Sequence, residues 1–208
     1  MLMDSNDPVE ATIATYDKFA AHYITQYTDR TPYQPLYDYF LAHLDGKKIL
    51  DVGCGPGHDT AYFTTQGLEV TAIDLSKSLL TFAGQSAPKA SFKVMDMRAL
   101  EFPPKTFDGL WVMASFQHLP KTDARKTLAG FRTVLNDSGL LYLSVTEGTG
   151  EGLMSKERYF GNSKYFANYT ETEITQLLTE SGFTVADILR AKTLRQNAFM
   201  DIFARPTV

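Results

Sequence analysis

Residues 48–59 read KILDVGCGPGHD, a short apolar run that ends at an acid and continues into a glycine-dense turn. Residues 60–66 after the turn indicate a helix. This order is typical of a buried parallel strand that leads into a tight loop and then into a helix N-terminus. Glycine lets the backbone approach a ligand closely, and the helix end offers unpaired N–H groups and partial positive charge. The stretch therefore predicts a site for a ligand with an anionic group and a sugar.

The spacing of the glycines distinguishes between nucleotide classes. A dinucleotide fingerprint requires G-x-G-x-x-G, and His58 stands where its third glycine would be. The Gly-Lys-Ser/Thr ending of a phosphate-binding P-loop is also absent. Asp51, two residues before Gly53, would repel a pyrophosphate but would attract an ammonium group. The loop therefore favours a ligand that carries both a carboxylate and an amine.

A second acid follows at the distance that a nucleoside site requires. Residues 68–74 read LEVTAID, an alternating pattern typical of a strand, with Asp74 at its C-terminal tip. In nucleotide-binding α/β folds an acid at this position hydrogen-bonds the ribose hydroxyls. Its separation from the glycine turn, about 20 residues, is the expected one.

Taken in order, these and later segments resemble the motifs of class I S-adenosylmethionine-dependent methyltransferases. Residues 49–60 resemble the D-V-G-C-G-x-G motif, and Asp74 is similar to the ribose-binding acid. The later matches are the adenine-contacting pair at 96–97, the F-D-x-V strand at 107–113, the segment ending in His-Leu at 115–119, and the turn and fifth strand at 136–143. The resemblance covers roughly residues 45 to 205 and implies S-adenosylmethionine as cofactor, with S-adenosylhomocysteine as product.

The alternation of strands and helices predicts an α/β fold with a mostly parallel sheet. Expected strands are 48–52, 69–74, 91–95, 107–113 and 139–146, and expected helices are 8–27, 33–44, 57–66, 76–86 and 122–135. A capping box at 170–173 starts a further helix that ends near residue 180. Two more strands, at 184–189 and 197–205, complete a Rossmann-like, seven-stranded sheet, which the resemblance implies has an antiparallel last strand.

A single domain is expected over residues 1–208, because the chain is long enough for one well-buried core and short for two. We divide it into an N-terminal helical cap (1–45), a cofactor-binding core (46–146), and an acceptor-side segment with the C-terminal edge strands (147–208).

The resemblance also implies which residues hold the cofactor. The glycines would shape the loop around the methionine moiety, and Asp51 would meet its amino group, directly or through water. Asp96 would accept a hydrogen bond from the adenine amine. The N-terminal helix would close over the donor. The implied cofactor-binding set is Tyr16, Tyr23, Asp51, Gly53, Cys54, Gly55, Gly57, Asp74, Leu75, Asp96, Met97, Ala114 and Ser115.

The acceptor side carries less information. Methyl transfer from a sulfonium mainly requires alignment of the reacting atoms, so the family has no universal catalytic residue. We leave the catalytic residue unknown, with His118 as candidate, and expect substrate contacts from Gln117, His118, Tyr159 and Tyr165. The alternative for His118 is a satisfied histidine that packs at a strand end, and the alternative for Tyr159 and Tyr165 is packing in the core.

Composition excludes several partners. A net charge of −4 and the absence of a basic cluster argue against a nucleic-acid substrate. The one cysteine cannot form an intramolecular disulfide, the N-terminus lacks the features of a signal peptide, and no apolar run approaches about 18 residues. The four histidines show no metal-ligand spacing, so no metal is expected. We expect a cytoplasmic monomer or homodimer without a membrane partner.

The predicted function is methyl transfer from S-adenosylmethionine to an oxygen, nitrogen, sulfur or carbon atom of a small-molecule acceptor. One alternative is an NAD(P)-dependent oxidoreductase, against which His58 argues. The other is a non-catalytic S-adenosylmethionine-binding regulatory protein.

Overall fold

A seven-stranded sheet forms the centre of the molecule. The computed structural model describes residues 7–155, 157–159, 161–190 and 198–207. In the sheet the strands lie in the order β3-β2-β1-β4-β5-β9-β8. Their bounds are β1 Lys48–Val52, β2 Glu69–Asp74, β3 Ser91–Val94, β4 Phe107–Val112, β5 Leu135–Thr146, β8 Phe183–Leu189 and β9 Phe199–Pro206. The first five are parallel, and β9 is antiparallel to both β5 and β8. The predicted α/β architecture is therefore confirmed.

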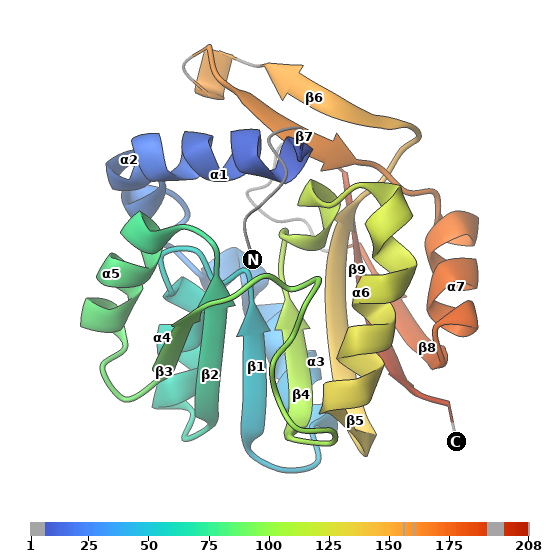
Figure 1. The fold of residues 1–208 in the computed structure, drawn as a ribbon. Helices are drawn as coiled ribbons and strands as arrows, with labels where there is room; N and C mark the ends of the chain where they lie inside the picture. The colour runs from blue at the N-terminus through green and yellow to red at the C-terminus, as the bar shows by residue number, and fades with distance from the viewer. Residues whose placement is uncertain (1–6, 156, 160, 191–197, 208) are drawn as a thin grey trace.

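Helices cover both faces of this sheet (Figure 1). Their bounds are α3 Gln34–His43, α4 His58–Thr65, α5 Lys77–Ser86, α6 Lys121–Val134 and α7 Glu171–Glu180. On one face α6 and α7 bury Leu128, Phe131 and Leu178 against the strands. On the other face α3 and α4 bury Phe40 and Phe63 around Trp111. Because helices bury both faces of the sheet, the central strands carry near-continuous apolar runs.

The predicted helix over 8–27 is wrong as a single element. The chain forms α1 Pro8–Lys18 and α2 Ala20–Thr25, and Phe19 between them leaves the helical region at φ −115°. In an unbroken helix Tyr16 and Tyr23, seven residues apart, would be separated by about 10 Å along the axis. In the structure their ring centroids lie 4.6 Å apart. The break therefore brings two aromatic rings together at the end of α1.

The turn predicted at 136–139 is part of β5 instead. Phe107 pairs with Leu135 and Gly109 with Leu140, so β5 carries extra residues between these two pairs. Asn136 Nδ2 donates to Asp108 Oδ1 over 2.6 Å, which holds the irregular segment against β4. The polar residues 136–138 thus lie in an irregular, bulged part of β5 rather than in a turn before it.

A second, two-stranded sheet was not predicted. It consists of β6 Glu151–Ser155 and β7 Ser163–Ala167. In Figure 1 it lies beside α1 at the carboxyl-terminal edge of the large sheet. Thr15 Oγ1 donates to the Ser163 carbonyl over 2.9 Å, and the Tyr165 N–H donates to Thr12 Oγ1 over 2.8 Å. These bonds join the N-terminal helix to a strand almost 150 residues later.

The remaining short elements are 3₁₀ helices at Thr31–Tyr33, Phe116–His118 and Glu157–Tyr159. The predicted start of the last strand, Asn197, lies outside the described residues. In the part of the chain that the structure describes, no helix is both long and apolar enough to cross a membrane.

Candidate functional site

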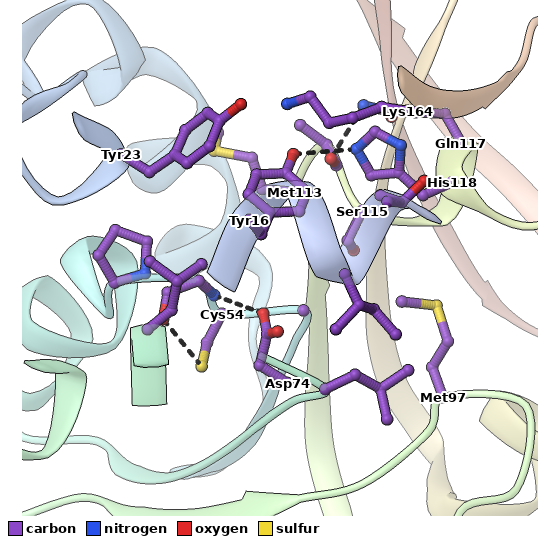
Figure 2. Close-up of a pocket in the computed structure, with 18 of the residues that line it drawn as sticks. Tyr16, Tyr23, Cys54, Asp74, Met97, Met113, Ser115, Gln117, His118 and Lys164 are labelled. Atoms are coloured by element: carbon purple, nitrogen blue, oxygen red, sulfur yellow. Dashed lines mark hydrogen bonds between the residues drawn. The ribbon is translucent and has the colours of Figure 1, made fainter. Parts of the chain in front are cut away.

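A cavity of about 550 Å³ opens at the carboxyl ends of β1, β2 and β4. In open parallel sheets this edge is the usual ligand position. The glycine loop, α1, α2 and β7 complete the cavity walls. The predicted site residues that line it are Tyr16, Tyr23, Gly53, Cys54, Gly55, Asp74, Leu75, Asp96, Met97, Ala114, Ser115, Gln117, His118 and Tyr159. Figure 2 shows many of these side chains converging on one space.

The glycine loop forms the floor of one half of the cavity. Gly53 has φ +71°, and a Cβ there would lie 2.4 Å from the Ser115 Cβ. Gly55 has φ +53°, and a Cβ there would meet no protein atom within 4 Å. Gly53 thus allows close packing of β1 on the segment after β4, whereas Gly55 leaves open space for a ligand.

Gly57 does not line the cavity. It has φ +80° at the start of α4, and a Cβ there would lie 2.7 Å from the Ala83 Cβ. Its role in the structure is to let α4 pack closely on α5.

Asp74 holds the glycine loop from the tip of β2. Its Oδ2 accepts from the Gly55 N–H and its Oδ1 from the Ser76 N–H, both over 2.8 Å. Burial raises the pKa of Asp74, and the backbone N–H groups of Ser76, Gly55 and Leu75 oppose that shift. A carboxylate offers about four acceptor positions. Asp74 therefore keeps acceptor capacity for a hydroxyl donor from a ligand.

Asp51 lies behind the loop and outside the cavity lining. It is 2% exposed and accepts from Thr60 Oγ1 over 2.5 Å. Burial and the nearby Asp59 raise its pKa. Because Asp51 does not line the cavity, a contact with a ligand amine would require a bridging water, and this contact stays a prediction.

Arg30 and Asp59 line the cavity near the loop and were not among the predicted site residues. Asp59 pairs with Arg30 and accepts from the Tyr37 hydroxyl and, over 3.0 Å, from Trp111 Nε1. Burial alone would lower the pKa of Arg30, but Asp59 raises it overall. Asp59 could have been suspected from its place in the first turn of α4. Arg30 lies in no motif.

Asp96 and Met97 line the cavity beyond β3. The Asp96 carboxylate is already held by Arg98, whose Nε and Nη2 donate to Oδ2 over 2.9 and 2.7 Å. Arg98 also pairs with Asp7 and Asp123. This charge network fixes the orientation of Asp96 and ties the start of α1 to the wall of the cavity.

The segment after β4 is strained. Ala114 has φ +52°, a left-handed conformation that is uncommon for alanine and is often found at functional sites. The Gln117 Nε2 donates to the Ala114 carbonyl over 2.9 Å, and Ser115 Oγ donates to the Val52 carbonyl over 2.7 Å. These bonds hold the segment against β1.

His118 lies in the other half of the cavity, where Figure 2 shows its bond to Tyr16. Both of its ring nitrogens are bonded. Its Nδ1 lies 2.7 Å from the Tyr165 carbonyl, which can only accept, so Nδ1 carries the proton. The Nε2 of the neutral ring then accepts from the Tyr16 hydroxyl over 3.1 Å. Burial first, and the charge of Lys164 second, lower the pKa of His118 to about 3.

The structure does not place the Tyr165 side chain where a substrate contact was predicted. Tyr165 does not line the cavity, whereas its neighbours Lys164 and Phe166 do. Successive side chains of a strand point to opposite faces, so β7 presents Lys164 and Phe166 inward and Tyr165 outward. Tyr165 packs into the core instead and contributes only its carbonyl, to His118.

Cys54 is buried, and burial raises the pKa of its thiol. A thiol with a raised pKa is a poor nucleophile. Among the described residues no cluster of histidine, cysteine and acidic side chains has the geometry of a metal site.

Comparison with known proteins gives consistent results. The family model of the Methyltransferase domain matches residues 49–139. A curated S-adenosyl-L-methionine-dependent Diels-Alderase iccD of Talaromyces variabilis is 35% identical over 116 residues, which are 52% of this chain and 39% of that protein. A ubiquinone biosynthesis O-methyltransferase of Xanthomonas campestris is 31% identical over 147 residues, which are 64% of this chain and 61% of that protein. The chain therefore spans less than two thirds of the length of these relatives.

Solved structures match over the whole fold. A 1,6-didemethyltoxoflavin-N1-methyltransferase of Burkholderia thailandensis, solved with 1,6-didemethyltoxoflavin and S-adenosylhomocysteine, superposes with a TM-score of 0.75 at 25% identity. The match covers 100% of this chain and 94% of that one. DhpI in complex with S-adenosylhomocysteine superposes with a TM-score of 0.77 at 18% identity, over 98% of this chain and 99% of that one, which bears on the fold alone.

Proposed function

We propose that this chain is a class I S-adenosylmethionine-dependent methyltransferase, and that it methylates an oxygen, nitrogen, sulfur or carbon atom of a small molecule. One observation carries the proposal. The open space beside Gly55 and the free acceptor positions of Asp74 face the same cavity as Tyr16, Gln117 and His118. Donor and acceptor can therefore be held side by side.

The donor half has a group for each part of S-adenosylmethionine. Asp74 would accept from the ribose hydroxyls. Leu75 and Met97 supply apolar surface for the adenine, beside the carboxylate of Asp96. Near the glycine loop, Arg30 and Asp59 provide the opposite charges that a carboxylate and an ammonium group require. These residues fit the cofactor, and their roles in binding it are proposals.

S-adenosylmethionine supplies a methyl group already activated by its sulfonium charge. What the protein adds is alignment and exclusion of water, each of which lowers the barrier. The β6–β7 sheet and α1 give the cavity walls that exclude water. We propose Gln117, His118 and Tyr159 as acceptor contacts, with Lys164 and Phe166 taking the place of Tyr165.

A cytoplasmic location, a small-molecule acceptor and the division into cap (1–45), core (46–146) and acceptor-side segment (147–208) complete the proposal. The location is supported by the single cysteine, which suits a reducing compartment. The small-molecule acceptor is supported by the cavity, whose volume is typical of small-ligand sites.

Calorimetric titration of the purified protein with S-adenosylhomocysteine, with NADH as a parallel control, tests the proposal. Micromolar binding of the first and none of the second is expected. Binding of NADH alone would refute the proposal in favour of an oxidoreductase. If S-adenosylhomocysteine binds, release of S-adenosylhomocysteine from S-adenosylmethionine across a panel of acceptors distinguishes an enzyme from a regulatory binding protein.

A further inference from the structure

We propose that the acceptor is a planar weak acid that reacts as its anion, recognised by Lys164 through its negative charge and by Gln117 through an N–H or O–H donor. This inference rests on the proposed function and specifies its substrate class. Four features of the acceptor half of the cavity support it, namely a buried cation, a histidine with both nitrogens bonded, an amide oxygen with no donor among the described residues, and flat aromatic walls.

The cation is Lys164, which lines the cavity and is only 4% exposed. Its ammonium lies 4.1 Å from the ring centroid of Tyr16, 4.5 Å from that of Tyr23 and 4.4 Å from that of Tyr159. The faces of aromatic rings attract a cation and offset part of the cost of burying it. Figure 2 shows the Lys164 side chain reaching along the wall toward Tyr16 and Tyr23. The acceptor half of the cavity therefore has a positive wall, at which an anion in a water-poor space is stabilised.

His118 does not supply a base to remove a proton from the acceptor. Its Nδ1–H is donated to the Tyr165 carbonyl, and its Nε2 accepts from the Tyr16 hydroxyl. Both nitrogens are thus occupied within the protein. Among the described residues, the charged or titratable groups that line this half alongside His118 are Tyr16, His22, Tyr23, Tyr159 and Lys164, none of them a carboxylate.

The described carboxylates that line the cavity all belong to the donor half, where each has partners. Asp59 pairs with Arg30, Asp74 accepts from the glycine loop, and Asp96 is held by Arg98. In the part of the chain that the structure describes, an acceptor that must lose a proton would find no carboxylate in the half that holds His118 and Lys164. An acceptor that is already ionised needs none.

Gln117 gives an independent indication of the ligand. It is 3% exposed, and its Nε2 donates to the Ala114 carbonyl over 2.9 Å. Its Oε1 is buried at the cavity with no hydrogen-bond partner among the described residues. A buried amide oxygen without a donor is costly, and it can only accept. A ligand with an N–H or O–H group at this position would satisfy it.

The walls favour a flat molecule. The rings of Tyr159 and Phe166 are nearly parallel at 15°, and Phe166 and His118 lie 4.8 Å apart edge to face. Aromatic faces bind planar groups by stacking. A planar ring with an ionised oxygen or nitrogen and a neighbouring N–H or O–H, such as the monoanion of a catechol or of a heterocyclic imide, matches all of these features, whereas a simple phenolate matches all but the donor.

The methyl transfer then balances without a proton. The lone pair of the ionised acceptor atom forms a bond to the methyl carbon, while the carbon–sulfur bond breaks and its electron pair passes to sulfur. The negative charge of the acceptor and the positive charge of the sulfonium cancel. Both products are neutral at the reacting atoms.

The test measures binding to the protein saturated with S-adenosylhomocysteine. The probes are matched pairs of a weak acid and its methylated neutral form, namely 4-nitrophenol with 4-nitroanisole and 5-nitrouracil with 1,3-dimethyl-5-nitrouracil. Each acid absorbs differently when ionised, so difference spectra report the ionisation state of the bound probe. Working at a pH about one unit below the pKa of each free acid makes ionisation on binding visible.

We expect at least one acid to bind as its anion, about tenfold or more tightly than its neutral partner. Lys164→Met should abolish this preference and the anion spectrum, and Lys164→Arg should retain both. Lys121→Met is the matched control, because the Lys121 ammonium also lies over a tyrosine ring, 4.8 Å from the Tyr169 centroid, but outside this cavity. Gln117→Leu should weaken the binding of 5-nitrouracil, which has N–H donors, and leave the binding of the 4-nitrophenol anion unchanged.

Three results would overturn the inference. They are equal binding of acids and neutral partners, an anion preference that survives in Lys164→Met, and no binding of any acid to the loaded protein. S-adenosylhomocysteine affinity is measured on every sample. If S-adenosylhomocysteine itself does not bind, the proposed function has failed. If it binds and the acids show no Lys164-dependent preference, only the acceptor class is wrong.

Discussion

Replacing Gly55 by alanine separates what the glycine loop does for folding from what it does for binding. Gly55 has φ +53°, and an added Cβ meets no protein atom within 4 Å. The methyl group would therefore project into the space that we assign to the donor. Gly67 is the matched control, because it has φ +81°, also has open space around it, and lies on the exposed turn before β2.

The stability cost should be alike at the two positions. A left-handed conformation costs alanine about 1–2 kcal/mol. The smaller conformational freedom of alanine in the unfolded chain returns about 0.4–1 kcal/mol. The net loss is then about 1 kcal/mol, which lowers the Tm of a domain of this size by about 2–4 °C.

The binding cost should differ between the two positions. Crowding a close-packed surface with one methyl group costs about 1–3 kcal/mol. For Gly55→Ala this corresponds to roughly a 5- to 150-fold weaker affinity for S-adenosylhomocysteine. For Gly67→Ala the affinity should equal that of the wild type, since Gly67 does not line the cavity.

Calorimetric titration and thermal unfolding of both variants measure these effects on the same samples. Wild-type affinity in a folded Gly55→Ala protein would refute the assignment of this space to the donor. Equal loss of affinity in both variants would instead show that the effect is a general consequence of destabilisation.

Three further substitutions test other parts of the structure. Asp74→Ala should weaken S-adenosylhomocysteine binding in calorimetry by about 1–3 kcal/mol, through lost ribose hydrogen bonds. Asp108 is the control acid, since it accepts backbone N–H groups at the start of β1, and Asp108→Ala should leave this affinity unchanged. Gly109→Ala should lower the free energy of unfolding in urea by about 1–3 kcal/mol, since its Cβ would lie 2.7 Å from core side chains, and an unchanged midpoint would contradict this. The pKa of His118 is lowered from 6.5 to about 3 in the folded state, so protons bind the unfolded chain preferentially and acid destabilises the fold. As the pH is lowered from 6.5 to about 3, the free energy of unfolding of the wild type should fall more steeply than that of His118→Gln, by about 1.4 kcal/mol per pH unit. Parallel curves of unfolding free energy against pH would contradict the pKa shift.

The donor half of the cavity could be predicted because it is built locally. The glycine loop and Asp74 belong to one βαβ unit within residues 48–74, where strand, turn and helix leave distinct patterns. Asp51 and Gly57 belong to the same unit, but the pattern does not show which way each points. The structure places Asp51 behind the loop and Gly57 between α4 and α5.

The strand β7 shows why the acceptor half could not be predicted in the same way. The sequence marks an aromatic cluster near Tyr159 and Tyr165, but aromatic residues are equally common in cores and in ligand sites. A strand exposes alternate residues to each side, so an error of one position exchanges Tyr165 for Lys164. Only the pairing of β7 with β6 and its bonds to α1 decide which set faces the cavity.

The two halves differ in how far apart their residues lie in the chain, and this difference bears on function. The glycine loop and Asp74 of the donor half are close in sequence, so a family can retain them while other parts change. The acceptor half joins three distant segments, which are residues 16–23, 114–118 and 159–166. Side-chain bonds such as those from Thr15 to the Ser163 carbonyl and from the Tyr165 N–H to Thr12 hold α1 against β7. A substitution in β7, at Lys164 or Phe166, changes the charge or the shape of the acceptor half at a segment remote in sequence from the glycine loop. The identity of the acceptor must therefore be encoded in contacts such as that of Lys164 with the rings of Tyr16, Tyr23 and Tyr159, rather than in the motifs that identify the family.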